Sequence, residues 1–251
     1  NSIRMYRSRY IDEYGEIVLA CDGPNNWRRS AFPQYKANRK KGRDESTFDW
    51  NEAFRILHLV REEIKENFPY KVIHIDQCEA DDIIGTLVDL KSDVPINPEP
   101  IMIVSSDRDF VQLQRFPNVK QYSPILKKEV VESNPRLFLQ THIIKGDKGD
   151  GVPNILSDDD TFVTEGKRQK PIRKAVLAEW KKQKPEQFVN GEMASGYVRN
   201  RQLVDLSLTP DEIKQEVVEE YMRQKGKSRQ HLLNYFVKFR LKNMMEVLDD
   251  F

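Results

Sequence analysis

The stretch VIHIDQCEADD, residues 72–82, contains the pattern that decides the fold: a short apolar run, then a turn, then acidic residues at the start of a helical segment. Two further apolar runs of strand length occur at residues 17–21 and 101–104. Continuous apolar runs of this length are typical of buried parallel strands. Helical periodicity at residues 48–68 and 80–90 separates the three runs along the chain. Strands that alternate with helices predict an α/β core with a mostly parallel central sheet flanked by helices.

The second half of the chain is mostly helical by the same criterion. After residues 127–131, helical segments are predicted at residues 135–145, 171–182, 211–224 and 230–248. We therefore divide the chain near residue 133 into an α/β core, residues 1–132, and a C-terminal helical subdomain, residues 133–251. The chain opens with Asn1 and a helical segment, so we expect an N-terminal strand to be missing upstream of it.

The composition fits a soluble, intracellular protein. A length of 251 residues suffices for one large domain, or for a core and a smaller subdomain. The longest apolar runs are about five residues, whereas a membrane helix needs roughly 20, so we expect no membrane segment. Two cysteines, Cys21 and Cys78, lie in apolar, strand-like settings and are predicted to be reduced thiols. The net charge of +1 decides neither for nor against nucleic acid.

Acidic residues follow each predicted strand, at the sheet edge where open α/β proteins bind their ligands. Together with a later Gly-Asp turn, these acids are Asp22, Glu79, Asp81, Asp82, Asp107, Asp109, Asp147 and Asp150. Carboxylates gathered in one crevice repel one another and usually require cations, and hard ions such as Mg²⁺ prefer oxygen ligands. The sequence therefore predicts more than one metal ion at this edge. Whether Asp81 or Asp82 is the ligand stays open, because Asp82 shares a helix face with Glu79 and Asp81 does not.

Each acidic cluster also has an ordinary structural explanation. Acids at helix starts often serve as N-caps, and aspartates in glycine-containing turns often shape the loop. Their joint occurrence after successive strands is what favours a metal site. The acidic run at residues 158–160 lacks this placement and is predicted to be solvated loop. The scattered histidines are predicted to be ordinary surface or packing residues; they are His58, His74, His142 and His231.

A cationic segment follows the first acid. Between Gly23 and Arg43 the chain contains no acid and seven basic residues: Arg28, Arg29, Lys36, Arg39, Lys40, Lys41 and Arg43. Aromatic side chains alternate with the basic ones over residues 27–39, a pattern that suits phosphate contacts and base stacking on single-stranded nucleic acid. Its position after Asp22 would let it clamp a substrate phosphate over the ions. The alternative is a solvated basic helix whose aromatic residues belong to the core.

Five motifs occur in the order typical of one family. They are Asp22, YKANR at residues 35–39, EADD at 79–82, SDRDF at 106–110 and GDKGDGVP at 146–153. In this order they resemble the 5′ nuclease (flap endonuclease) superfamily, and in particular its ribonuclease H branch from T-even-like bacteriophages. The resemblance extends over essentially the whole chain. It implies a PIN-like nuclease core with a basic arch segment, residues 23–47, and a helix-hairpin-helix-like element in a duplex-binding C-terminal subdomain.

The resemblance implies a metal-dependent 5′-3′ exonuclease and flap endonuclease with ribonuclease H activity. Such an enzyme removes RNA primers and adjacent DNA during phage DNA replication, in the cytoplasm of the infected host cell. The implied cofactors are two Mg²⁺ ions, with Mn²⁺ as a substitute, and K⁺ at the hairpin. The implied partners are flapped or nicked duplex DNA, RNA–DNA hybrid, a single-stranded DNA-binding protein and a sliding clamp, and we expect a monomer.

Residue roles carry over motif by motif. The resemblance assigns Asp22, Glu79, Asp81 and Asp82 to a first metal site, and Asp107, Asp109, Asp147 and Asp150 to a second. It implies that the basic catalytic residues near the scissile phosphate are Lys36, Arg28 and Arg29. It implies nucleic-acid contacts by Trp27, Tyr35, Arg39, Lys40, Lys148, Gly149 and Gly151.

Two other functions fit parts of the sequence. A non-catalytic nucleic-acid-binding relative would keep the fold and hold a flapped duplex without cutting it, and a missing N-terminal aspartate strand would favour this alternative. A metal phosphohydrolase acting on a small molecule would use Asp107 and Asp109 but would not need residues 27–39.

Overall fold

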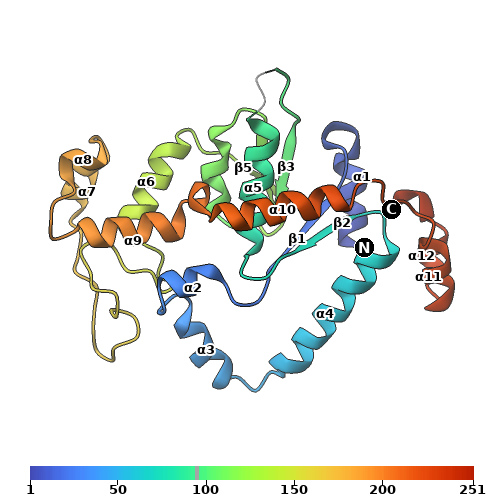
Figure 1. Ribbon diagram of the computed structural model, residues 1–251, viewed down its shortest axis with the longest axis horizontal. Coiled ribbons are helices and arrows are strands. Elements are labelled where there is room, and N and C mark those ends of the chain that lie inside the picture. The colour runs from blue at the N-terminus through green and yellow to red at the C-terminus, as the bar shows by residue number, and fades with distance from the viewer. Residues whose placement is uncertain (94–95) are drawn as a thin grey trace.

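The computed structural model describes residues 1–93 and 96–251, without the side chains of Lys40 and Lys41, and contains two short sheets surrounded by helices (Figure 1). The strands are β1 (Val18–Cys21), β2 (Lys71–His74), β3 (Ile101–Val104), β4 (Val119–Ser123) and β5 (Lys128–Val130). β1 pairs in parallel with β2, β3 pairs in parallel with β4, and β5 runs antiparallel to β4. Within the described ranges no strand joins the two sheets. The three predicted strands and their mostly parallel arrangement are confirmed.

Helices form most of the rest of the chain. They are α1 (Ser2–Tyr14), α2 (Trp27–Ala31), α3 (Ala37–Asp44), α4 (Trp50–Asn67), α5 (Ala80–Ser92), α6 (Pro135–Lys145), α7 (Lys174–Trp180), α8 (Pro185–Phe188), α9 (Ala194–Val204), α10 (Asp211–Arg223), α11 (Leu232–Lys238) and α12 (Lys242–Met245). Three 3-10 turns complete the set: η1 (Asp109–Arg115), η2 (Leu206–Leu208) and η3 (Leu248–Asp250). The helix predicted at residues 230–248 is divided between α11 and α12, because Arg240 has a positive φ of 53° that interrupts helical geometry.

Two helices that position functional residues begin at side-chain caps. The carboxylate of Asp49 accepts a hydrogen bond from the backbone N–H of Glu52 at 2.9 Å and starts α4. The side chain of Asn134 accepts one from the backbone N–H of Leu137 at 3.0 Å and starts α6, with Pro135 in the first turn. Asparagine and aspartate caps of this kind satisfy amides that the helix leaves unpaired, and proline suits the first helical position.

The core crosses the predicted boundary at residue 133. α10 lies across α5 in Figure 1, and its Ile213 and Val217 pack in one cluster with Ile73 of β2 and Ile83 of α5. A second cluster joins Phe236 of α11 to the chain before and within β1. The C-terminal helices therefore cover the α/β part directly, and the division of the chain into two units stays a prediction.

The helices α2, α3 and α4 project from one side of the molecule and form an arch, defined here as residues 27–67 (Figure 1). No side chain of α4 is buried, among those that the structure describes. The predicted arch segment, residues 23–47, forms the first limb, and α4 forms the second. Among the described residues, no helix has both the length and the apolar character needed to cross a membrane.

The motif at residues 146–153 forms a tight turn after α6. Gly146 has a φ of 67°, and the backbone N–H of Val152 donates to the carbonyl oxygen of Asp147 at 2.7 Å. The predicted element thus has its first helix and its hairpin. The chain then continues in turns, and the next helix is α7.

Candidate active site

Asp22 lies at the carboxyl end of β1 and contacts the start of α5. Its Oδ1 atom accepts a hydrogen bond from the backbone N–H of Ala80 at 2.8 Å. The chain after Asp22 passes so close to the end of β2 that a Cβ atom on Gly23 would lie 1.7 Å from the carbonyl oxygen of Ile75. Only glycine fits this approach. The acid that follows β1 is therefore held beside the acids that follow β2, as the shared edge of parallel strands requires.

Asp81 connects the acids that follow β1 and β2 to the acids that follow β3. Burial raises the pKa of Asp81 to about 8, and the charges of Asp107 and Asp109 add to the shift. Asp107 accepts a hydrogen bond from the backbone N–H of Asp109 at 2.9 Å, so one turn presents both carboxylates. Of the two aspartates that the sequence leaves open as ligands, Asp81 is the one whose carboxyl group is influenced by the acids after β3.

The fourth group of acids comes from the turn after α6. Burial raises the pKa of Asp109 to about 6; the neighbouring His142 opposes this shift, and the charges of Asp107, Asp147 and Asp150 add to it. Asp147 in turn accepts a hydrogen bond from the backbone N–H of Asp150 at 3.1 Å. We call the convergent set the acidic site: Asp22, Glu79, Asp81, Asp107, Asp109, Asp147 and Asp150.

His142 of α6 lies inside this set, and the prediction that it is an ordinary surface or packing residue does not account for its two carboxylate neighbours. Its Nδ1 atom is 3.2 Å from Oδ1 of Asp109, and its Nε2 atom is 3.2 Å from Oδ2 of Asp147. One ligand atom from each of the three residues lies within 4.8 Å of the others, close enough to share a metal ion. A sequence signal existed: His142 lies five residues before Asp147, on the helix that leads into the acidic turn.

Lys36 and Tyr35 lie between two parts of the acidic site. The Lys36 ammonium is 2.5 Å from Oε1 of Glu79 and 3.5 Å from Oδ2 of Asp150. The Tyr35 hydroxyl is 2.9 Å from Glu79 Oε2 and 2.9 Å from Asp150 Oδ2. The turn after α6 packs against the same segment, since a Cβ atom on Gly151 would lie 3.1 Å from the carbonyl oxygen of Gln34. Lys36, from the cationic segment after Asp22, thus reaches the acids.

Arg28 and Asp82 form a buried ion pair. The Arg28 side chain is 2% exposed and that of Asp82 is 0% exposed, and two bonds of 2.8 Å join the guanidinium to both carboxylate oxygens. Arg28 also contacts Glu79 at 3.2 Å. Asp82 accepts further hydrogen bonds from the Trp27 indole, the Thr209 hydroxyl and the backbone N–H of Glu79. Burial disfavours its charge, but Arg28 lowers the pKa of Asp82 below its ordinary value.

This pair corrects several predictions. Asp82 has no free oxygen for a metal ion, and Arg28 cannot reach a phosphate from its buried position, so Arg28 positions Glu79 instead. Trp27 and Tyr35, predicted to contact nucleic acid, are buried and hydrogen-bonded to acids. Gly151 is buried beneath residues 34–38. In each case the predicted surface residue is part of the scaffold that holds the acids.

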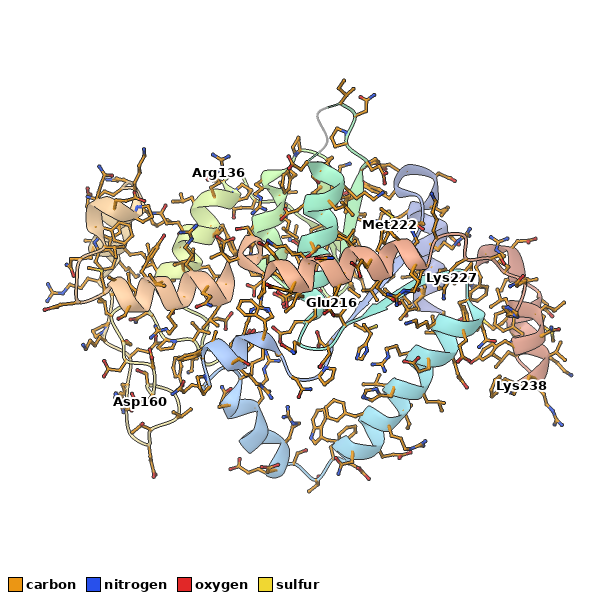
Figure 2. The ribbon with its side chains drawn as sticks, viewed as in Figure 1. Arg136, Asp160, Glu216, Met222, Lys227 and Lys238 are labelled. Atoms are coloured by element: carbon orange, nitrogen blue, oxygen red, sulfur yellow. The ribbon has the colours of Figure 1, made fainter. Side chains whose placement is uncertain are left out.

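The remaining predicted contacts are exposed. They are Arg29, Arg39, Lys148 and Gly149. Arg39 also pairs with Asp150 at 2.5 Å, which directs it toward the acidic site. The side chain of Lys40 lies outside the described residues. The run at residues 158–160 lies on the loop between α6 and α7, where Figure 2 labels Asp160. Asp160 pairs with Lys167 of the same loop.

Aromatic side chains of the arch were missed as candidate contacts. Phe48, Trp50 and Phe54 are 58%, 38% and 44% exposed. Their rings follow one another, with centroids 4.8 Å apart for Phe48 and Trp50 and 6.0 Å apart for Trp50 and Phe54. Helical periodicity at residues 48–68 predicts this helix, and its face that carries Trp50 and Phe54 is exposed. An exposed row of aromatic rings is unusual for a helix and suits stacking on nucleic-acid bases.

The site combines acids from several strand ends and from a turn with a lysine that lies between them. An arch with exposed aromatic rings stands beside it. These features together define a nuclease of the metal-dependent α/β type. The chain belongs to the 5′-3′ exonuclease family: residues 2–142 match its N-terminal resolvase-like domain, and residues 133–251 match the C-terminal domain of T4 RNase H. The predicted family is confirmed.

Known proteins with similar sequences support this assignment. The chain is 36% identical to the ribonuclease H of Enterobacteria phage T4 over 247 residues, which cover 95% of this chain and 80% of the relative. It is 28% identical to DNA polymerase I of Streptococcus pneumoniae strain R6 over 155 residues, 57% of this chain but 16% of that protein. The second similarity is therefore confined to about half of the chain.

Solved structures show the same fold. The T5 D15 protein co-crystallized with metal ions matches with a TM-score of 0.61 at 17% identity, covering 89% of this chain and 92% of that one. The T5 D15 flap endonuclease in a pseudo-enzyme-product complex with DNA and metal ions matches with a TM-score of 0.56 at 18% identity, covering 99% and 90%.

Proposed function

We propose that this 5′ nuclease uses Mg²⁺ to remove RNA primers and adjacent DNA from 5′ ends during phage DNA replication. The observation that carries the proposal is the convergence of the acidic site around Lys36. Acids from the ends of β1, β2 and β3 and from the turn after α6 meet there, and burial and mutual repulsion raise the pKa values of two of them. Such a cluster is costly unless cations occupy it.

The side chains present fit two divalent ions. We assign Asp22, Glu79 and Asp81 to the first, and Asp107, Asp109, Asp147 and Asp150 to the second. Carboxylate oxygens are the ligands that Mg²⁺ prefers, and Mn²⁺ takes the same ligands. When bound, the ions would neutralise the phosphodiester and polarise its attacking water. We withdraw Asp82 from the predicted ligands, because its side chain is fully buried and Arg28 binds both of its oxygens inside the protein.

Lys36 is the proposed catalytic cation. Its ammonium already lies between Glu79 and Asp150, where a phosphate held over the acids would meet it. Positive side chains at this place stabilise the negative charge that develops on the phosphate oxygens. Arg29 and Arg39, both exposed, are the neighbouring cations that would contact the flanking phosphates.

The proposed substrates are flapped or nicked duplex DNA and RNA–DNA hybrid. The arch would hold the single strand, with Phe48, Trp50 and Phe54 stacking on its bases. Lys148 and Gly149, exposed at the turn after α6, would contact the duplex backbone, and K⁺ binding at this turn stays a prediction. We propose a monomer that works with a single-stranded DNA-binding protein and a sliding clamp in the cytoplasm of the infected cell; family resemblance supports this.

The test is cleavage of a labelled 5′ flap and of a labelled RNA–DNA hybrid in Mg²⁺. We expect cutting by the wild type and loss of cutting by the double variant D107N/D109N. D158N/D160N is the matched control, since it removes two acids from the loop outside the acidic site. Undiminished cutting by D107N/D109N would refute the site. Tight binding of the flap by wild type without cutting would favour the binding module, and hydrolysis of small phosphodiesters alone would favour the small-molecule enzyme.

A further inference from the structure

His142 occupies a place that the proposed function does not use. Its side chain is 15% exposed, and both ring nitrogens face carboxylates: Nδ1 faces Asp109 and Nε2 faces Asp147, each at 3.2 Å. The ring also packs edge-on against Phe138, one turn earlier on α6, with centroids 6.1 Å apart. The imidazole is therefore fixed in orientation and lies between two proposed metal ligands.

The spacing of the donor atoms fits a shared ion. Ligand atoms bonded to one ion at about 2.1 Å lie roughly 3 to 4.2 Å apart. One donor atom each from Asp109, His142 and Asp147 already lies within 4.8 Å of the others, so small side-chain adjustments suffice. An imidazole ring that binds the ion through one nitrogen keeps its other nitrogen for a hydrogen bond to the second carboxylate. Metal-binding histidines usually have this second hydrogen bond, because it fixes the tautomer and orients the ring.

We propose that His142 is a nitrogen ligand of the second metal site, together with Asp109 and Asp147, and gives this site a preference for Mn²⁺ over Mg²⁺. The inference rests on the proposed two-metal function and deepens it. Sites built of carboxylates alone suit Mg²⁺, whereas an imidazole ligand favours first-row transition ions over Mg²⁺. The first site, proposed with oxygen ligands only, would keep its preference for Mg²⁺, so the two sites would differ in the ion that they select.

The experiment measures metal binding directly on the full chain at pH 8, with Mn²⁺ as the probe. Pulsed electron paramagnetic resonance detects a directly bound imidazole nitrogen through its coupling to Mn²⁺, and calorimetry gives the affinity of each site. We expect a nitrogen coupling in the wild type. In H142A we expect that coupling to vanish and one site to bind Mn²⁺ at least tenfold more weakly, while Mg²⁺ affinity changes less than threefold.

The controls separate this inference from the proposed function. H231A removes an exposed histidine and should keep the nitrogen coupling. H142Q retains a hydrogen-bonding side chain, so a folded H142Q without the coupling confirms the result if H142A does not fold. Cleavage of a 5′ flap by the wild type in Mg²⁺ is measured in parallel. Cutting without any nitrogen coupling would overturn the inference alone, whereas a coupling without cutting would overturn the proposed function alone.

Discussion

Replacing Arg28 with alanine removes the centre of a buried polar network. The guanidinium donates two bonds of 2.8 Å to Asp82, one of 3.2 Å to Glu79 and one of 2.8 Å to the carbonyl oxygen of Leu203. In R28A the carboxylate of Asp82 stays fully buried and loses its only cationic partner among the described residues. Its remaining donors are the Trp27 indole, the Thr209 hydroxyl and one backbone N–H.

The expected loss of stability follows from this geometry. Removing one partner of a buried ion pair costs about 3–5 kcal/mol, because an unpaired charge is left behind. We expect R28A to lower the free energy of unfolding by about 4 kcal/mol and the melting temperature by about 10 °C. Replacing both partners with apolar residues, in R28M/D82L, should recover at least half of the loss, since no charge is then buried.

The assay is urea unfolding followed by tryptophan fluorescence and circular dichroism. R29A is the matched control, because the neighbouring arginine is exposed and its removal should change stability by less than about 0.5 kcal/mol. If R28A and R29A unfold within 1 kcal/mol of each other, the assignment of Arg28 to a structural ion pair is refuted, and the original prediction of a phosphate contact regains its place.

Three further perturbations test other parts of the structure. The pKa of Asp81 in the folded protein, about 8, lies above its ordinary value of 3.8, so metal-free stability should fall as pH rises from about 4 to 8. In thermal unfolding with EDTA at pH 8, D81N should be more stable than wild type by about 2 kcal/mol. This is below the roughly 6 kcal/mol that the full pKa shift of an isolated carboxyl group would correspond to. Equal stability of the two proteins would contradict the burial of this charge. G23A should lose about 3 kcal/mol or more because the added Cβ meets backbone, whereas G42A, where the space is open, should stay within 1 kcal/mol in the same melts. W50A/F54A should bind a single-stranded oligonucleotide at least tenfold more weakly by fluorescence anisotropy, at unchanged melting temperature; unchanged affinity would remove the arch aromatics from the proposed interface.

The strands and the acids after them were predictable because their signals are local. Short apolar runs followed by turn residues specify parallel strands, and the strand ends place Asp22 and Asp81 at the edge of one sheet and Asp107 after β3 of the other. The family resemblance rests on the same residues. The strands and the acids after them can be predicted without knowing which side chains distant in sequence contact each other.

The roles of Arg28, Trp27 and Tyr35 depend on such distant partners. Arg28 and Asp82 are 54 residues apart, and an arginine in a cationic segment gives no local sign that it is buried. The alternative for this segment, a basic helix whose aromatic residues belong to the core, describes Trp27 and Tyr35 correctly.

Helix α9 escaped prediction for a related reason. Its fully buried position is filled by Asn200, whose side-chain amide donates to the carbonyl oxygens of Ile143 and Pro153 at 2.8 and 2.9 Å. Gly196 is also buried, because a Cβ atom there would lie 2.4 Å from the carbonyl oxygen of Ile155. Leu203 and Val204 are buried too, but the small and polar residues beside them weaken the hydrophobic periodicity that would reveal this helix.

The packing of α10 on β2 and α5 bears on how such proteins exchange parts during evolution. A recombination event that joined the first half of this chain to the second half of another nuclease of the family would set foreign side chains against Ile73 and Ile83 in place of Ile213 and Val217. The hybrid would fold only if the donor's helix matched that surface.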